Sequence, residues 1–261
     1  MILSWLSGLY LLAAAGIALF GLLGLVTLIY YLRHRQETFP CPPVQDADLP
    51  HVTVQLPIFN ERFVVGRLID SAAHLDYPRN KLQIQVIDDS TDDTTEIAQA
   101  IVHQYLEQGL NIELLHRTHR NGYKAGALEA ALERAKGEFI ALFDADFQPQ
   151  PDFLRQTVPH FLDEPDLGMV QTRWGHLNPF DSQLTAAQTI ALDKHFAMEQ
   201  TVRHRASLFP KFNGSAGVWR RQCLDDAGGW EADTVCEDLC LSTRAILKGW
   251  KFRFLNEVVS P

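Results

Sequence analysis

The sequence predicts an α/β domain with a mostly parallel sheet, preceded by one transmembrane helix. Two observations carry this prediction. After residue 50, short strand patterns alternate with helical patterns, which is typical of a parallel sheet with helices on its faces. Before residue 33 the chain contains no charged side chain, and a run of that length can cross about 30 Å of hydrocarbon as a helix.

The apolar segment from Leu9 to Leu32 has the flanks of a membrane anchor. Trp5 lies near one end, and Tyr30 and Tyr31 lie at the other, where interfacial aromatic residues are enriched. Arginines follow at once and no Lys or Arg precedes the segment, so the positive-inside rule places the rest of the chain in the cytoplasm. We therefore expect residues 1–35 to form a transmembrane helix with a basic flank. The alternative is a helix buried in a protein core.

A proline-rich linker, residues 36–50, leads into the predicted domain, residues 51–261. We expect four strands with helices between them. The strands are His51–Pro57, Lys81–Ile87, Asn111–Leu115 and Phe139–Phe143, and the helices are Glu61–Leu75, Thr94–Gln108 and Tyr123–Lys136. Asp181–Ser207 has the apolar spacing of a long amphipathic helix, and from the pattern alone it is just as well a helix that packs on the core.

Composition excludes several classes of protein. The net charge of −9 and the pI of about 5.5 argue against a nucleic-acid partner, which would need a basic face. Four scattered cysteines are too few for a disulfide scaffold. The chain lacks the glycine-rich motifs of dinucleotide-binding proteins and of P-loop enzymes. A bound nucleotide would therefore be held by carboxylates and a metal ion.

Carboxylates follow three of the predicted strands. Glu61 comes shortly after the first, Asp88 and Asp89 follow the second, and Asp144 and Asp146 follow the fourth. The carboxyl ends of parallel strands share one crevice, where like charges repel unless cations or hydrogen-bond donors offset them. Several carboxylates together with substrate phosphates are the usual setting for Mg²⁺ or Mn²⁺.

Two alternatives remain open for these acids. Residues 88–93 also suit the start of a helix, where acidic side chains are favoured. The D-x-D at Asp144 and Asp146 also occurs in haloacid-dehalogenase-type phosphatases. Such an enzyme would carry Thr or Val where Gln148 stands, and its motif would follow the first strand.

The ordered motifs of the chain resemble those of membrane-bound family 2 glycosyltransferases, most closely the cellulose-synthase-like branch that makes β-1,4-mannan and glucan backbones. The resemblance covers residues 51–261. It rests on PIFNE, VIDDSTDDT, NGYKAGAL, FDADFQP, FNGSAGVWRR, AGGW and VCEDLCLSTRAILKGWKF. It implies a GT-A fold and a metal-dependent, inverting transfer of a hexose from UDP-glucose or GDP-mannose to a glycan or lipid acceptor. In this family the region matching Asp181–Ser207 approaches the membrane.

The resemblance also implies roles for individual residues on the donor side. Asp88, or its neighbour Asp89, matches the carboxylate that contacts the nucleotide base. Glu61 and Lys124 match its companions around the nucleoside. Asp144 and Asp146 match the D-x-D pair, with Asp146 on a divalent cation, Mg²⁺ or Mn²⁺.

On the acceptor side, Asp238 matches the family's general base, with Glu237 beside it as a further substrate contact. Without the resemblance, Asp238 is an ordinary acid in the first turn of a helix. Phe212, Asn213 and Gly214 match the loop that lies against the acceptor sugar.

The family's polymer-building members carry a Q-x-x-R-W motif and more transmembrane helices further along. This sequence ends at Pro261 without them, and Gln171–Trp174 only resembles the motif, so we expect a truncated form. Three hypotheses follow. The chain is an active membrane-anchored transferase, a catalytically silent membrane subunit with the nucleotide-sugar fold, or a metal-dependent phosphatase.

Overall fold

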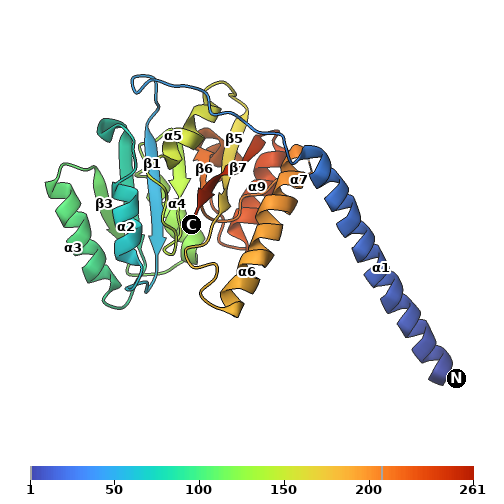
Figure 1. Ribbon diagram of the computed structural model, residues 1–261. Coiled ribbons are helices and arrows are strands. Elements are labelled where there is room, and N and C mark those ends of the chain that lie inside the picture. The colour runs from blue at the N-terminus through green and yellow to red at the C-terminus, as the bar shows by residue number, and fades with distance from the viewer. Residues whose placement is uncertain (1, 207) are drawn as a thin grey trace.

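The computed structural model describes residues 2–206 and 208–261 of the chain. The described residues form a seven-stranded sheet in the order β3-β2-β1-β4-β6-β5-β7 (Figure 1). The strands are β1 Val52–Ile58, β2 Leu82–Asp88, β3 Ile112–His116, β4 Phe139–Leu142, β5 Leu167–Trp174, β6 Gly217–Arg220 and β7 Lys251–Ser260. Only β6 runs antiparallel to its neighbours in this sheet, so the predicted mostly parallel α/β fold is confirmed.

Helices cover both faces of the sheet. The first half of the domain contributes α2 Val65–Ala73, α3 Thr94–Glu107, α4 Tyr123–Leu132 and α5 Phe153–Thr157, with short 3-10 turns at Arg79–Lys81 and Val158–Phe161. The second half contributes α6 Gln183–Asp193, the π-helical segment η3 Lys194–Gln200, α7 Thr201–Arg205, α8 Arg221–Ala227 and α9 Glu237–Leu247. Helices α2, α3 and α5 pack on one face, and α4, α8 and α9 pack on the other.

The polar positions of the alternating strands are buried as well as the apolar ones. All seven residues of β2 are buried, including Gln83 and Gln85. Their amides bond to Thr53 and Gln55 on β1, and both donate to Glu113 on β3. This ladder satisfies polar groups that burial would otherwise leave unpaired, and it joins three neighbouring strands.

Helix α1, Ile2–His34, projects away from the domain (Figure 1). The part from Trp5 to His34 is long and apolar enough to cross a membrane, and none of its most apolar stretch is buried against the rest of the chain. Within the described residues, α1 is therefore not a core helix. The helix contacts η3 and α7. Beyond its end, the guanidinium carbons of Arg205 and Arg253 lie 4.0 and 4.4 Å from the centroid of the Phe39 ring.

The long helix predicted at Asp181–Ser207 differs from expectation. The structure divides it into α6, η3 and α7, and Ser207 lies outside the described residues. Leu184 and Ile190 on α6 are 69% and 72% exposed, so these two side chains do not pack on the core, which was one of the two alternatives for this helix. The core contact is made instead by Phe196 in η3, whose ring lies 4.9 Å from that of Trp174.

His160 gives the fold a testable dependence on pH. It is buried, with Nδ1 3.1 Å from Arg253 Nη1, and burial followed by the Arg253 charge lowers its pKa to about 4. The unfolded chain binds this proton at about pH 6.5, so the folded state loses stability as pH falls from there to about 4. His160→Gln should reduce this slope by up to about 1.4 kcal/mol per pH unit. Urea unfolding at several pH values measures it, and identical slopes in both proteins would refute the assignment.

Candidate active site

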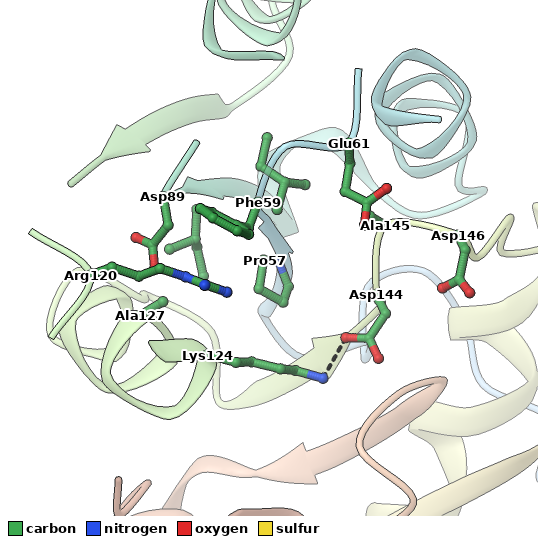
Figure 2. A pocket seen from close by; sticks show the side chains of 12 residues that line it. Pro57, Phe59, Glu61, Asp89, Arg120, Lys124, Ala127, Asp144, Ala145 and Asp146 are labelled. Carbon is green, nitrogen blue, oxygen red and sulfur yellow. Dashed lines mark hydrogen bonds and ion pairs between the residues drawn. The ribbon is translucent and has the colours of Figure 1, made fainter. Parts of the chain in front are cut away.

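A cavity of about 480 Å³ opens at the carboxyl ends of β1, β2 and β4, beside the first turn of α4. It is lined by Pro57, Ile58, Phe59, Glu61, Ile87, Asp89, Arg120, Lys124, Ala127, Asp144, Ala145 and Asp146. Glu61, Asp144 and Asp146 lie on one side, and Asp89 and Arg120 lie on the other (Figure 2). The cavity thus has an acidic end and a mixed-charge end.

Strand pairing explains why acids distant in sequence meet here. β1 lies between β2 and β4, with Ile58 opposite Asp88 and Gln55 opposite Leu142. The chain leaves all three strands at the same edge of the sheet, where ligands bind in open α/β folds. The structure therefore brings together the acids that follow the first, second and fourth predicted strands.

Asp88 and Asp89 have different environments. The carboxylate of Asp88 is fully buried and accepts hydrogen bonds from the Ser90 N–H at 2.9 Å and the Thr95 hydroxyl at 2.6 Å. His116 Nδ1 lies 2.7 Å from it. Burial works to raise the pKa of Asp88, but these hydrogen bonds outweigh it and lower the pKa. Asp88 does not line the cavity, so only Asp89 of this pair is placed to meet a ligand there.

Asp89 is held by a bidentate ion pair. Arg117 Nε and Nη2 donate to its two carboxylate oxygens at 2.7 and 2.6 Å. Arg120 lies over the ring of Phe59, with its guanidinium carbon 3.4 Å from the ring centroid. Arg120 and Phe59 were not among the predicted site residues. A basic cluster of His116, Arg117, His119 and Arg120 after β3 was a signal for Arg120. Phe59 lies in the PIFNE motif, but its residue type is equally that of a core residue.

Lys124 joins two elements at the acidic end. Its amino group donates to Asp144 Oδ1 (Figure 2). It also donates to the carbonyl oxygen of Gly214 at 2.9 Å. The Asp144 N–H donates to the Ser215 hydroxyl at 2.9 Å. Burial raises the pKa of Asp144, Lys124 opposes this effect, and the charges of Asp146 and Asp238 add to it. Lys124 therefore lies at the acidic end rather than beside Asp89.

The acidic end has the ligand chemistry of a divalent-cation site. Burial, then the charges of Asp146 and Asp92, raise the pKa of Glu61. No group of three or more His, Cys, Asp or Glu side chains in the described parts of the chain forms a metal cage. Mg²⁺ and Mn²⁺ accept one or two carboxylates when substrate phosphates and water complete the shell. Asp144 and Asp146 fit that pattern, with a diphosphate supplying the rest.

The predicted acceptor-side residues lie beside the cavity and do not line it. Asp238 is in the first turn of α9, and its carboxylate faces Gly214, where φ is +83°. A Cβ added at Gly214 would lie 3.4 Å from Asp238 Oδ2 and 3.7 Å from Lys124 Nζ. Glu237 precedes Asp238 in the same turn.

Phe212 and Asn213 are held by the protein itself. Phe212 is fully buried, and its ring lies 5.6 Å from that of Trp219 in the core. The Asn213 N–H donates to Gln171 Oε1 at 3.0 Å, and its side chain meets His195. Gly214 is thus the member of the predicted loop that faces both Lys124 and Asp238.

A second cavity of about 270 Å³ adjoins the first. The two share Asp146, and the second is also lined by Phe147, Trp174, Gly175, His176, Leu177, Asn178, Leu192 and Pro261. The rings of Phe147 and Trp174 meet at 5.1 Å. A smaller cavity with aromatic side chains on its wall therefore adjoins the acidic end of the first cavity.

Residues 50–259 match the protein family described as "Glycosyltransferase like family 2". The chain belongs to this family. The match confirms the resemblance shown by the sequence motifs, and it sets aside the phosphatase alternative. It also assigns the sheet, with its acids at the strand ends, to a glycosyltransferase domain.

Relatives and a solved structure agree with this assignment. The chain is 41% identical over 239 residues to a glucomannan 4-beta-mannosyltransferase 1 of Oryza sativa subsp. japonica, covering 87% of this chain and 46% of the relative. It is 43% identical over 216 residues to a glucomannan 4-beta-mannosyltransferase 2 of Arabidopsis thaliana, covering 81% and 40%. The chain therefore spans less than half the length of these curated relatives.

The solved structure is the mannosyltransferase PcManGT of Pyrobaculum calidifontis in complex with GDP-Man and Mn²⁺. It is 28% identical to this chain, with a TM-score of 0.72, over 95% of this chain and 67% of that one. This structural similarity supports the GT-A-like fold independently of the sequence motifs.

Arg117→Gln tests the ion pair that supports the glycosyltransferase cavity. The side chains of Arg117 and Asp89 are 18% and 4% exposed, so the substitution removes the bidentate partner of a buried carboxylate and leaves it only Arg120, whose Nε lies 3.9 Å from Asp89 Oδ2. We expect the free energy of unfolding to fall by about 3 kcal/mol in urea denaturation. The matched control is Arg134→Gln, whose ion pair with Glu113 is exposed on the arginine side and should cost less than about 1 kcal/mol. Equal losses in the two variants would contradict this account of Asp89.

Proposed function

We propose that this chain transfers mannose from GDP-mannose to a growing β-1,4-linked glycan, with inversion at the anomeric carbon. The observation that carries the proposal is that Lys124, Asp144 and Gly214 meet beside Asp238. Asp144 and its neighbour Asp146 also line the open cavity. The choice of donor is supported by the proteins named above, which are mannosyltransferases. The structure of one of them was solved with GDP-Man.

The mixed-charge end of the cavity suits the guanine base. Guanine presents two adjacent donors, N1–H and the N2 amino group, and a carboxylate accepts both. Asp89 is oriented by Arg117 and has acceptor capacity left on both oxygens. The stacked pair of Arg120 and Phe59 offers a flat wall against which a base or ribose packs.

The acidic end suits the diphosphate. Asp146 and Asp144 would hold a divalent cation, Mg²⁺ or Mn²⁺, together with the phosphate oxygens. When bound, such a cation neutralises the charge that develops on the leaving diphosphate. Lys124 keeps Asp144 in place and adds a positive charge on the same side.

Asp238 is the proposed general base. The acceptor hydroxyl loses its proton to Asp238 while its oxygen attacks the anomeric carbon from the face opposite the diphosphate. One carbon–oxygen bond forms as the bond to the diphosphate breaks, so an α-linked donor gives a β-linked product. The second cavity, with Trp174 on its wall, is the proposed place of the acceptor sugar.

We also propose that α1 anchors the enzyme in a membrane. Arg33 and Arg35 follow its apolar part, which places the catalytic domain on the cytoplasmic side by the positive-inside rule. Donor nucleotide sugars would then reach the cavity from that side.

A titration of GDP-mannose and UDP-glucose against the full chain in detergent, with and without Mn²⁺, tests the donor site. We expect Mn²⁺-dependent binding of GDP-mannose that is at least about tenfold tighter than that of UDP-glucose. Asp146→Asn should abolish the effect of Mn²⁺, because the variant loses a carboxylate ligand. Asp163→Asn, an exposed site outside the cavity, is the matched control. Metal-independent binding, or equal affinity for both donors, would contradict the proposal.

Asp238→Asn tests the transfer step. The variant should bind GDP-mannose like the unaltered chain, because Asp238 does not line the donor cavity. Transfer to manno-oligosaccharides should fall by at least about 10²-fold, the contribution of a positioned base. Transfer at an undiminished rate would exclude Asp238 as the base. A well-folded chain that binds no donor would instead favour the catalytically silent subunit.

A further inference from the structure

The helix between α6 and α7 becomes π-helical beside the candidate active site. This segment, η3, covers Lys194–Gln200, and π-helical turns are rare and frequently mark functional sites. Phe196 fixes the segment to the fold, since it is fully buried against Trp174. The neighbouring residue, His195, has no role in the chemistry described so far.

His195 connects η3 to the loop that carries Gly214. Its Nδ1 lies 3.2 Å from Glu199 Oε2, and its Nε2 lies 3.1 Å from Asn213 Oδ1. The Glu199 carboxylate and the Asn213 amide oxygen both only accept hydrogen bonds, so both ring nitrogens carry a proton, with Nδ1 donating to Glu199 and Nε2 donating to Asn213 Oδ1. Lys194 Nζ holds the other oxygen of Glu199 at 2.9 Å. The imidazole is therefore oriented from one side, and Nε2 is directed at Asn213.

Asn213 depends on this contact for its side-chain orientation. Its Nδ2 is buried and has no hydrogen-bond partner among residues 2–206 and 208–261. The bond between Oδ1 and His195 is thus the polar contact that fixes the amide. A buried amide that loses it would leave both of its ends unsatisfied.

The loop after Asn213 positions the groups at the acidic end. The Gly214 carbonyl accepts from Lys124, and the Ser215 hydroxyl accepts from the Asp144 N–H. Gln171, a buried residue of β5, donates from Nε2 to the carbonyl oxygens of Ser215 and Ala216, both at 3.0 Å. The loop is therefore held by Gln171 on the core side and by His195 on the outer side.

We propose that His195 and Glu199 are positioning residues that fix the loop of residues 213–215, and through it Lys124 and the space beside Asp238. The proposal rests on the proposed function for its catalytic consequence. A shift of the loop by about 1 Å would misalign Gly214 between Lys124 and Asp238, and misplacements of that size can cost about 10²-fold in rate. The ion pair of Lys124 with Asp144 does not involve His195, and Asp89 and Arg120 lie at the other end of the cavity, so donor affinity should change less than the rate.

The test compares His195→Ala and His195→Gln in the full chain, with His204→Gln as the matched control. His204 lies on the same continuous helix but bonds to the backbone of Phe252, away from the loop. In His195→Ala, hydrogen–deuterium exchange should rise in residues 211–216, and kcat for transfer should fall at least about tenfold with a Kd for GDP-mannose within about twofold. His195→Gln should recover most of the rate, because its amide can also bond to Asn213. His204→Gln should leave exchange in residues 211–216 unchanged.

A double-mutant cycle with Asn213→Ala separates positioning from general destabilisation. If His195 acts through Asn213, the double variant should be no slower than the slower single variant. Additive losses, unchanged exchange in residues 211–216, or equal effects of His204→Gln would overturn the proposal. The exchange readout needs no substrate, so the positioning role and the proposed transferase activity can fail independently.

Discussion

The ion pair of Lys124 with Asp144, extended to the carbonyl of Gly214, is the interaction on which the rest of the site depends. Asp144, Asp146 and Asp238 place three negative charges around one point of the sheet edge, and burial first, then the charges of Asp146 and Asp238, raise the pKa of Asp144. One ammonium group offsets part of that repulsion and at the same time ties α4 to the loop after α7.

Around this ion pair, buried amides and hydroxyls fix the backbone. Gln171 and Ser215 join β5, β4 and the Gly214 loop, while Gln83 and Gln85 join the first three strands. Each of these polar groups is costly to bury unless its partners are in place, so the networks favour one arrangement of the sheet edge. The cavity is therefore built on a frame of satisfied polar contacts, and the Gly214 loop is held in part by η3, which also contacts α1.

The first four strands and the acids that follow them were predictable, because period-two patterning and parallel topology force those acids to one edge. Partners distant in sequence decide the remainder. Asp88 and Asp89 are adjacent and chemically identical, and it is their partners at the end of β3, His116 for Asp88 and Arg117 for Asp89, that distinguish the acid outside the cavity from the acid that lines it. The outward face of α6 and the π-helical turn were also unpredictable, since apolar spacing does not say what an amphipathic helix packs against.

Lys124→Met tests the central claim most directly, with Lys136→Met, an exposed lysine near the end of α4, as the charge-matched control. The measurement is the Kd for GDP-mannose in the presence of Mn²⁺. Without Lys124, Asp144 faces Asp146 and Asp238 uncompensated and Gly214 loses its tether, so affinity should fall at least about tenfold in this variant alone. An affinity equal to that of the unaltered chain would show that the site does not depend on this ion pair.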